Sequence, residues 1–438
     1  MTDLLAQPLT LPCGAVLSNR LCKSAMTEGL ADPLLRATDA HERLYRRWAE
    51  GGAGLLITGN IMIDRRVLER PGNVALDPVP APGSEAFRRL QAWSAAGTCA
   101  GNQLWAQISH AGRQSPRYVT REPLAPSAVQ LDLLGNYARP RALREDEILD
   151  FIQRFARAAV CLREAGFTGV QIHAAHGYLL SSFLSPVTNR RSDAWGGSLE
   201  NRARFLLEAL RATRRAVGAD FAVGIKLNSD DFRKGGFSHT DCLQVVEWLN
   251  HERVDLLEIS GGTYEQPRLL GFSGRADSAV PQAASTRARE AYFLEYAASL
   301  RKVAKMPLMV TGGFRSRAGM EDALRSGACE VIGLARPLCT HPQIVGALLA
   351  RRTDTLPSLE TSHLRLGRSR WLGGASPLFL IKIINVLGQQ GWYYHQLERL
   401  GAGLEADLRK GVLGSFFRYL LAEYRSAWAV WRARRAAS

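Results

Sequence analysis

Apolar and polar residues follow two patterns that alternate along the chain. Short apolar runs are separated by longer stretches in which apolar positions recur every three or four residues, the spacing of one helix face. Eight of the short runs predict strands: Arg20–Ala25, Gly54–Ile61, Asn102–Ile108, Gly169–Ile172, Ala222–Leu227, Asp255–Ile259, Leu308–Thr311 and Val331–Leu334. Eight apolar strands that alternate with helices predict an α/β fold in which a parallel sheet closes into a (β/α)8 barrel, or TIM barrel.

The segments around these runs support the barrel. The stretches Glu147–Ala165 and Leu199–Val217 carry apolar residues on one helical face, and Ser198 is a suitable N-cap for the second. Before the first strand, Leu9–Leu11 and Val16–Leu17 predict a short β-hairpin that plugs the barrel floor. An open doubly wound sheet has the same periodicity, but it requires a G-x-G-x-x-G turn after the first strand, where this chain reads SAMTE.

Composition excludes several classes of protein and sets the last part of the chain apart. With 438 residues, of which 46% are hydrophobic and 22% charged, the chain is neither disordered nor a disulfide-stapled mini-protein. Residues 1–355 can form the barrel and residues 356–438 a separate extension; residues 351–438 hold 14 Lys and Arg against 6 Asp and Glu, a net +8 of the +15 on the whole chain. Because the basic excess is concentrated there, no nucleic-acid partner is expected.

Cysteines and apolar runs predict where the protein is found. The seven cysteines are scattered and form no Cys-x-x-Cys pair, which predicts reduced thiols and no iron–sulfur cluster. The longest apolar run, around Leu378 to Leu387, is interrupted by Lys382 and is too short to span a bilayer. We therefore expect a cytoplasmic protein.

Chemistry in such barrels takes place where the strands end, and the last two strand ends predict a phosphate site. The seventh strand is followed by Gly312 and Gly313 and then by a predicted helix over Ser316–Ser326. Backbone amides at a helix N-terminus attract an anion, and Ala335-Arg336 after the eighth strand adds a cation. Two tight turns and a surface arginine are the alternative interpretation. The other strand ends carry mostly hydrogen-bond donors and almost no carboxylates.

The end of the fourth predicted strand carries the most informative residues, His173, His176 and Tyr178. Two imidazoles three residues apart can direct their nitrogens at one oxygen atom, and a nearby phenol can deliver a proton. This combination suits the addition of hydride to a C=C bond that a carbonyl group activates. A zinc site with His110 as third ligand is an alternative, but the shortage of carboxylates argues against it, and we expect no metal. Two histidines buried for packing alone are the other alternative.

The residues around this histidine pair resemble a known family. The run from His173 to Arg202 reads HAAHGYLLSSFLSPVTNRRSDAWGGSLENR, and Asn19–Thr27, Gln107–Arg113 and Gly224–Phe232 accompany it. Together they are similar to the old yellow enzyme family of FMN-dependent NAD(P)H:flavin oxidoreductases, or ene reductases, over about residues 8–350. A run of this length is not a chance motif.

The resemblance implies that the cofactor is FMN and that the reductant is NADH or NADPH. Thr27 would donate to the flavin C4 carbonyl, Gly59 would allow the ring to approach the backbone, and Gln107 would bond the pyrimidine edge. Lys226 stands where many relatives have arginine, and it keeps a positive charge toward flavin N1 and O2. The residues implied in cofactor binding are Ala25, Met26, Thr27, Gly59, Gln107, Lys226, Gly312, Gly313, Ala335 and Arg336.

The same resemblance implies a reaction on a small-molecule enone. His173 and His176 would hold the substrate carbonyl oxygen, hydride would pass from NAD(P)H through flavin N5 to the β-carbon, and Tyr178 would protonate the α-carbon. Relatives with an iron–sulfur cluster have four cysteines after the last strand, where this chain has only Cys339. Two other functions stay open: a non-redox barrel for a phosphorylated metabolite, with Lys226 as a Schiff-base lysine, and a flavin-binding scaffold that acts through its C-terminal extension.

The C-terminal extension has a pattern of its own, since the resemblance fades beyond about residue 356. Apolar and aromatic residues three or four apart predict a helix from Leu413 onward with one apolar stripe, formed by Phe416, Phe417, Leu420, Leu421, Tyr424, Trp428 and Trp431. Arg418, Arg425 and Arg432 recur every seven residues beside it. In one interpretation the stripe packs onto the barrel or onto a sister subunit of a homo-oligomer. In the other, a basic amphipathic helix contacts an anionic membrane surface or an acidic partner.

Overall fold

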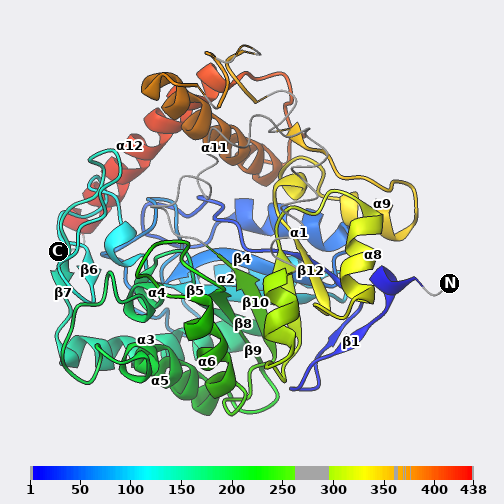
Figure 1. The fold of residues 1–438 in the computed structure, drawn as a ribbon. Helices are drawn as coiled ribbons and strands as arrows, with labels where there is room; N and C mark the ends of the chain where they lie inside the picture. Colours follow the sequence, from blue (N-terminus) through cyan, green and yellow to red (C-terminus); the bar gives the residue numbers. More distant parts are fainter. Residues whose placement is uncertain are drawn as a thin grey trace.

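Eight parallel strands close into a barrel, which confirms the predicted fold class. The computed structural model describes residues 3–261, 295–359, 364–367, 369, 371–374 and 376–436. Around the barrel the strands follow the order β10-β11-β12-β3-β4-β5-β8-β9 (Figure 1). Their bounds are β3 Leu21–Lys23, β4 Leu55–Met62, β5 Gln103–Ser109, β8 Gly169–Ala174, β9 Ala222–Asn228, β10 Leu256–Ser260, β11 Leu308–Thr311 and β12 Val331–Leu334. The closed barrel rules out the open doubly wound sheet.

The strands read as apolar runs because helices cover the outside of the barrel and side chains fill its inside. All eight lie within two residues of the predicted bounds. β3 ends at Lys23, two residues early, because the following segment leaves the sheet to pack across an irregularity in β4. That irregularity lies between Ile57 and Asn60, and there the carbonyl oxygen of Met26 lies 2.5 Å from where a Cβ on Gly59 would be.

The N-terminal hairpin closes the barrel floor, as predicted. Strands β1 (Leu9–Thr10) and β2 (Val16–Leu17) pair antiparallel, and Leu11 and Leu17 join the buried cluster at the amino ends of the barrel strands. Trp105 fills the centre of this layer. A Cβ on Gly169 would lie 2.6 Å from the Trp105 ring and one on Gly224 would lie 2.7 Å from it, so these two glycines make room for the indole.

Helices surround the barrel in the alternation that the sequence predicted. The main ones are α1 Asp39–Glu50, α2 Glu85–Gly97, α3 Glu145–Glu164, α5 Leu199–Val217, α6 His239–Leu249, α8 Arg317–Arg325 and α9 Ile344–Leu349. Shorter elements are η1 Leu4–Ala6, η2 Gly112–Gln114, α4 Leu179–Leu184, η4 Arg336–Cys339 and the paired strands β6 Leu124–Ala125 and β7 Arg141–Ala142. Ser198 caps α5 as predicted, because its hydroxyl accepts the N–H of Asn201 at 3.3 Å.

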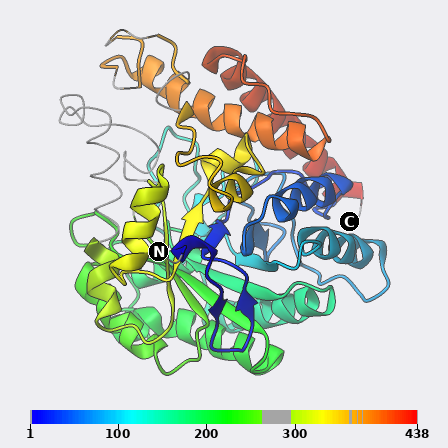
Figure 2. The ribbon, with the colours of Figure 1, turned by 90° about the vertical axis from the view of Figure 1, so that its right-hand side faces the viewer.

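Two helices form the predicted C-terminal extension, α11 (Phe379–Gly401) and α12 (Val412–Ala436). They lie together on one side of the barrel, and the N-terminal hairpin lies on the opposite side (Figures 1 and 2). The loops after β4 and β5 meet α12 at a buried ion pair between Arg70 and Glu423, and the Tyr118 hydroxyl donates to Oε2 of Glu423 at 3.0 Å. The extension therefore borders the carboxyl ends of the strands.

Helix α12 packs through a different face from the predicted one. Its buried residues are Val412, Ser415, Glu423, Ala427 and Val430. Most of the predicted stripe is exposed to solvent, namely Leu413, Phe417, Leu421, Tyr424, Trp428 and Trp431, whereas Phe416 and Leu420 are half-buried. The interpretation that the stripe packs onto the barrel is therefore wrong. No helix within the described ranges is both long enough and apolar enough to cross a membrane.

Candidate functional site

The end of β8 brings His173, His176 and Tyr178 together, as predicted. The His173 ring lies edge-on to the Tyr178 ring with the centroids 4.8 Å apart, and its centroid is 5.2 Å from that of His176. Burial lowers the pKa of both imidazoles well below the usual 6.5, and the nearby charge of Lys226 lowers both further. Both rings are therefore neutral near pH 7.

Hydrogen bonds fix how the two imidazoles are presented. The N–H of Ala175 donates to Nδ1 of His173 at 3.3 Å, so the proton of this neutral ring is on Nε2. Nε2 of His176 lies 2.5 Å from Oγ of Ser260, at the end of β10. His176 has a left-handed φ of +63°, and its N–H donates to Oδ1 of Asn228 at 3.1 Å. Strained backbone of this kind clusters at functional sites, which argues against packing as the only role of the pair.

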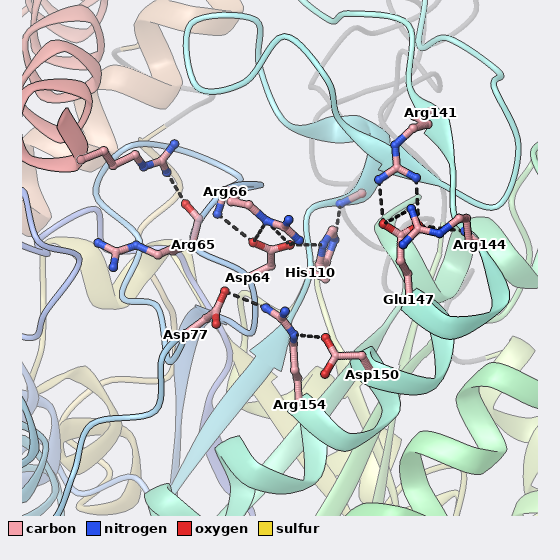
Figure 3. Close-up of polar contacts among 12 residues, drawn as sticks. Asp64, Arg65, Arg66, Asp77, His110, Arg141, Arg144, Glu147, Asp150 and Arg154 are labelled. Carbon is pink, nitrogen blue, oxygen red and sulfur yellow. Dashed lines mark hydrogen bonds and ion pairs between the residues drawn. The ribbon is translucent and has the colours of Figure 1, made fainter. Parts of the chain in front are cut away.

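The His110 ring has polar contacts of its own, with Asp64 and the backbone of Gly112 (Figure 3). Its Nδ1 accepts the N–H of Gly112 at 3.0 Å, and its Nε2 faces Oδ2 of Asp64 at 3.7 Å. Although burial opposes the shift, the His110 ring and the Arg66 guanidinium hold the pKa of Asp64 well below its usual range. Within the part of the chain that the structure describes, no group of three or more His, Cys, Asp or Glu is arranged to hold a metal. The geometry gives the zinc alternative no support.

A chain of polar side chains crosses the barrel interior from β5 to β10. Nε2 of Gln107 donates to Oε1 of Gln171 at 2.6 Å, and Nε2 of Gln171 donates to Oε2 of Glu258 at 2.8 Å. Oε1 of Glu258 lies 2.9 Å from Nζ of Lys226. The predicted residues Gln107 and Lys226 are thus joined by two that sequence reasoning missed. Since an ion-paired ammonium is not a free amine, this arrangement does not favour a Schiff-base lysine.

Thr27 and Gly59 lie side by side at the carboxyl-end rim of the barrel. The Thr27 hydroxyl and Nδ2 of Asn60 both donate to Oε2 of Glu69, each at 2.7 Å. The N–H of Gly59 donates to Oε1 of Glu28 at 2.8 Å. A Cβ on Gly59 would lie 2.6 Å from Cα of Thr27, so chain packing alone already requires glycine there. Glu28 and Glu69 correct the expectation that this end has almost no carboxylates.

The predicted phosphate residues gather at the ends of β11 and β12. Gly312 and Gly313 have φ angles of +124° and +81°, which favour glycine, and they precede the N-terminus of α8. Because β11 pairs with β12, these glycines lie beside Ala335 and the exposed side chain of Arg336. Backbone amides, a helix N-terminus and a guanidinium thus form one surface that suits an anion.

The residues of this rim and barrel centre fit FMN. Since a carboxylate only accepts hydrogen bonds, the Asn60 atom that faces Glu69 is the amide nitrogen. Oδ1 of Asn60 is then left buried with no hydrogen-bond partner among the residues that the structure describes. Ala25 and Met26 are half-buried on the segment before Thr27. The unpartnered Asn60 oxygen suits the N–H edge of the flavin, and the Lys226 ammonium suits a ring that accepts electrons. The anion-binding surface after β11 and β12 suits the phosphate of the cofactor.

Comparison with known proteins places the chain in a family. The sequence model of the NADH:flavin oxidoreductase / NADH oxidase family matches residues 5–354. The chain belongs to this family. The predicted resemblance to old yellow enzyme is confirmed, and so is the class of enzyme, an FMN-dependent NAD(P)H oxidoreductase. The roles of individual site residues and the division of the chain at residue 355 stay predictions.

Relatives and a solved structure extend this finding. NADH-dependent flavin oxidoreductase iccE of Talaromyces variabilis is 35% identical over 423 residues, which cover 91% of this chain and 99% of the relative. The iliE oxidoreductase of Neonectria sp. (strain DH2) is 36% identical over 389 residues, 84% of this chain, and the match spans half of that longer protein, 50%. The old yellow enzyme homologue from Zymomonas mobilis is 26% identical, with a TM-score of 0.65 over 82% of this chain and 95% of that chain.

The alignments also reach the C-terminal extension. The family match ends at residue 354. The alignment with the Talaromyces relative covers 91% of this chain, which is more than residues 1–354 can supply. Part of the extension therefore has a counterpart in the Talaromyces relative, although the resemblance was expected to fade near residue 356.

Proposed function

We propose that this oxidoreductase reduces the C=C bond of an α,β-unsaturated carbonyl compound. The observation that carries the proposal is the set of two neutral imidazoles and a buried phenol at the end of β8. Neutral imidazoles can donate hydrogen bonds to a carbonyl oxygen and so draw electrons from the conjugated C=C bond. A phenol still carries its proton near pH 7 and can give it up to carbon.

Each residue of the set has a distinct task. FMN, when bound, supplies the hydride that it takes from NADH or NADPH. Nε2–H of His173 donates to the substrate carbonyl oxygen, and His176, held by Ser260 and Asn228, stands beside it. Tyr178 delivers a proton to the carbon next to the carbonyl, so the C=C bond gains one hydride and one proton and becomes a single bond.

Replacing Tyr178 with phenylalanine tests the proposal. The variant keeps the ring that packs against His173 but has no proton to give. We expect reduction of a probe enone such as cyclohexenone to slow by about 10²–10⁴-fold, the loss typical of a missing general acid. Flavin reduction by NADH or NADPH, followed separately by stopped-flow absorbance, should stay near normal.

The exposed Tyr424 offers a matched control, because Tyr424→Phe removes a hydroxyl from α12 and leaves the set at the end of β8 intact. An equal loss in both half-reactions of Tyr178→Phe would contradict a proton-donor role. So would an unchanged rate of enone reduction.

We also propose that α12 rests on an anionic lipid surface. Among the described residues, thirteen of the seventeen exposed large hydrophobic side chains lie between Trp371 and Trp431. On α12 they include Phe417, with 61% of its surface exposed, and Trp428, with 57%. Contiguous exposed apolar residues of this kind mark an interaction surface.

The charges around this stripe identify the occupant. The guanidinium of Arg432 lies 4.7 Å from the ring of Trp428, and that of Arg435 lies 4.8 Å from the ring of Trp431. The one acidic residue of α12, Glu423, is buried against Arg70, so the exposed face combines aromatic and basic side chains. Tryptophan and arginine together suit the boundary between acyl chains and anionic headgroups.

Vesicle sedimentation tests this second proposal. The full chain should sediment with vesicles of phosphatidylcholine and phosphatidylglycerol but not with phosphatidylcholine alone, and moderate salt should weaken the binding. Trp428→Ser with Trp431→Ser, and separately Arg425→Gln with Arg432→Gln, should each reduce it about tenfold or more. Arg215→Gln on α5 and Leu149→Ser on α3 are the matched controls, since both side chains are exposed on helices outside the stripe. Equal sedimentation with both kinds of vesicle overturns the proposal. It is also overturned if the tryptophan variants lose self-association but still bind the anionic vesicles like the parent.

A further inference from the structure

One carboxylate at the barrel rim takes no part in the reaction proposed above. Oε2 of Glu69 accepts two hydrogen bonds of 2.7 Å, one from the Thr27 hydroxyl and one from Nδ2 of Asn60. Thr27 belongs to the loop after β3, and Asn60 to the end of β4. Glu69 therefore joins the ends of two neighbouring strands at the edge of the FMN site.

These two bonds decide what the rim can offer a ligand. A threonine hydroxyl has a single proton, and Thr27 gives it to Glu69, so the group keeps only its lone pairs for any other partner. Asn60 likewise keeps its buried Oδ1, which has no partner within the described part of the chain. With Glu69 in place the rim presents hydrogen-bond acceptors, whereas the family resemblance implies a donor at Thr27.

We infer that Glu69 is a positioning residue that sets the reduction potential of the bound flavin. It holds the Thr27 proton away from the flavin C4 carbonyl, and it adds a negative charge near the ring. Both effects disfavour the electron-rich, reduced form relative to the oxidised one. The acceptors that remain suit the N3–H group of the ring, which is present in both redox states. The inference rests on the proposed placement of FMN beside Thr27.

The next residue in the chain anchors Glu69 from the other side. The buried guanidinium of Arg70 pairs with Glu423 of α12 and lies 3.6 Å from the ring centroid of Tyr394 on α11. The N–H of Arg70 donates to Oδ1 of Asn73 at 2.8 Å. Glu69 thus stands on a segment whose backbone and neighbouring side chain are both fixed.

The test is the midpoint potential of the bound FMN, measured spectroscopically against a reference dye, together with the dissociation constant of oxidised FMN. In Glu69→Gln the new amide can donate to Thr27 and free its proton for the flavin. We expect reduced FMN to bind about tenfold more tightly relative to oxidised FMN, a rise of about 30 mV for a two-electron couple. Glu122→Gln, which neutralises an exposed carboxylate elsewhere, should leave the potential unchanged.

A double-mutant cycle with Thr27→Val separates the outcomes. In the Thr27→Val background, Glu69→Gln should raise the potential by clearly less than it does alone. An equal rise in both backgrounds means that Glu69 acts by charge without Thr27, and it overturns the positioning role. An unchanged potential in Glu69→Gln, beside a shifted one in Thr27→Val, overturns the inference but leaves the flavin placement intact. If Thr27→Val alters neither potential nor affinity, the placement fails and the inference with it.

Discussion

Buried histidines set how the molecule responds to pH, and His41 on α1 is the clearest case outside the site. Burial lowers its pKa from 6.5 to about 4, and its Nδ1 accepts the N–H of Thr38 at 3.1 Å. The unfolded chain binds a proton on this residue below pH 6.5 while the folded chain does not. The free energy of unfolding should therefore fall by about 3 kcal/mol as the pH drops from 6.5 to 4.

Replacing His41 with glutamine removes this titration and keeps an acceptor for the helix cap. Urea unfolding of the parent and of His41→Gln is measured at pH 7 and at several values down to pH 4. The free energy of unfolding of the parent should fall by about 3 kcal/mol more than that of the variant over this range. His251→Gln, at an exposed histidine, is the control. Parallel pH profiles for the parent and His41→Gln would show that this residue does not carry the loss.

At the residue scale, the sequence predicted the site residues that belong to local motifs. His173, His176 and Tyr178 lie within six positions, and the structure brings their rings together. Glu69 and Glu258 were missed because their partners are distant in the sequence: Thr27 lies 42 positions from Glu69, and Gln171 lies 87 positions from Glu258. A weak signal for Glu258 did exist, since a polar residue inside a strand buried on both faces needs a polar partner.

At the element scale, strands were easier to predict than helix faces. A parallel strand buried on both sides is apolar throughout, so its run of residues marks it directly. The face of α12 was predicted from its aromatic residues, yet the helix buries small and polar ones, among them Ser415 and Glu423. Glu423 is buried because Arg70, 353 positions away, neutralises it. Helical periodicity contains no information about such a partner.

The end of β12 and the start of η4 form the element on which FMN retention depends most. Arg336 begins η4 beside Gly312 and Gly313. Its guanidinium adds a positive charge to the backbone amides of the predicted phosphate-binding surface. A charge-assisted hydrogen bond contributes about 1.5–3 kcal/mol, so Arg336→Ala should raise the dissociation constant of FMN about 10–100-fold. Fluorescence titration of the apoprotein measures this change.

Arg325→Ala is the matched control, because Arg325 ends α8 with an exposed side chain. It should leave FMN affinity unchanged. An Arg336→Ala protein that retains flavin as tightly as the parent would place the phosphate elsewhere.

At the scale of the whole molecule, the C-terminal extension and the barrel are joined by side chains from both. Near the N-terminal end of α1, Nε of Arg43 donates to the carbonyl of Gly401 at 2.7 Å. At the far end of α12, Arg434 donates to the carbonyl of Arg65. Between them, the Arg70–Glu423 pair is buried under Tyr394. Contacts at the end of α11 and along α12 predict that these two helices unfold together with the barrel.

The Arg70–Glu423 pair provides the means to test this joint unfolding. Glu423→Ala leaves a buried guanidinium without its partner, which costs about 3–5 kcal/mol of stability. Glu398→Ala removes the partner of the exposed Arg418 in the same extension and should cost less than about 1 kcal/mol. Replacing both members of the buried pair, in Arg70→Met with Glu423→Leu, should recover most of the loss, because two apolar side chains need no countercharge. Urea unfolding followed by tryptophan fluorescence and by release of bound flavin should give one coincident transition in the parent. If the extension instead unfolds first and Glu423→Ala leaves the flavin transition where it was, the extension is an independent unit and the pair does not stabilise the barrel.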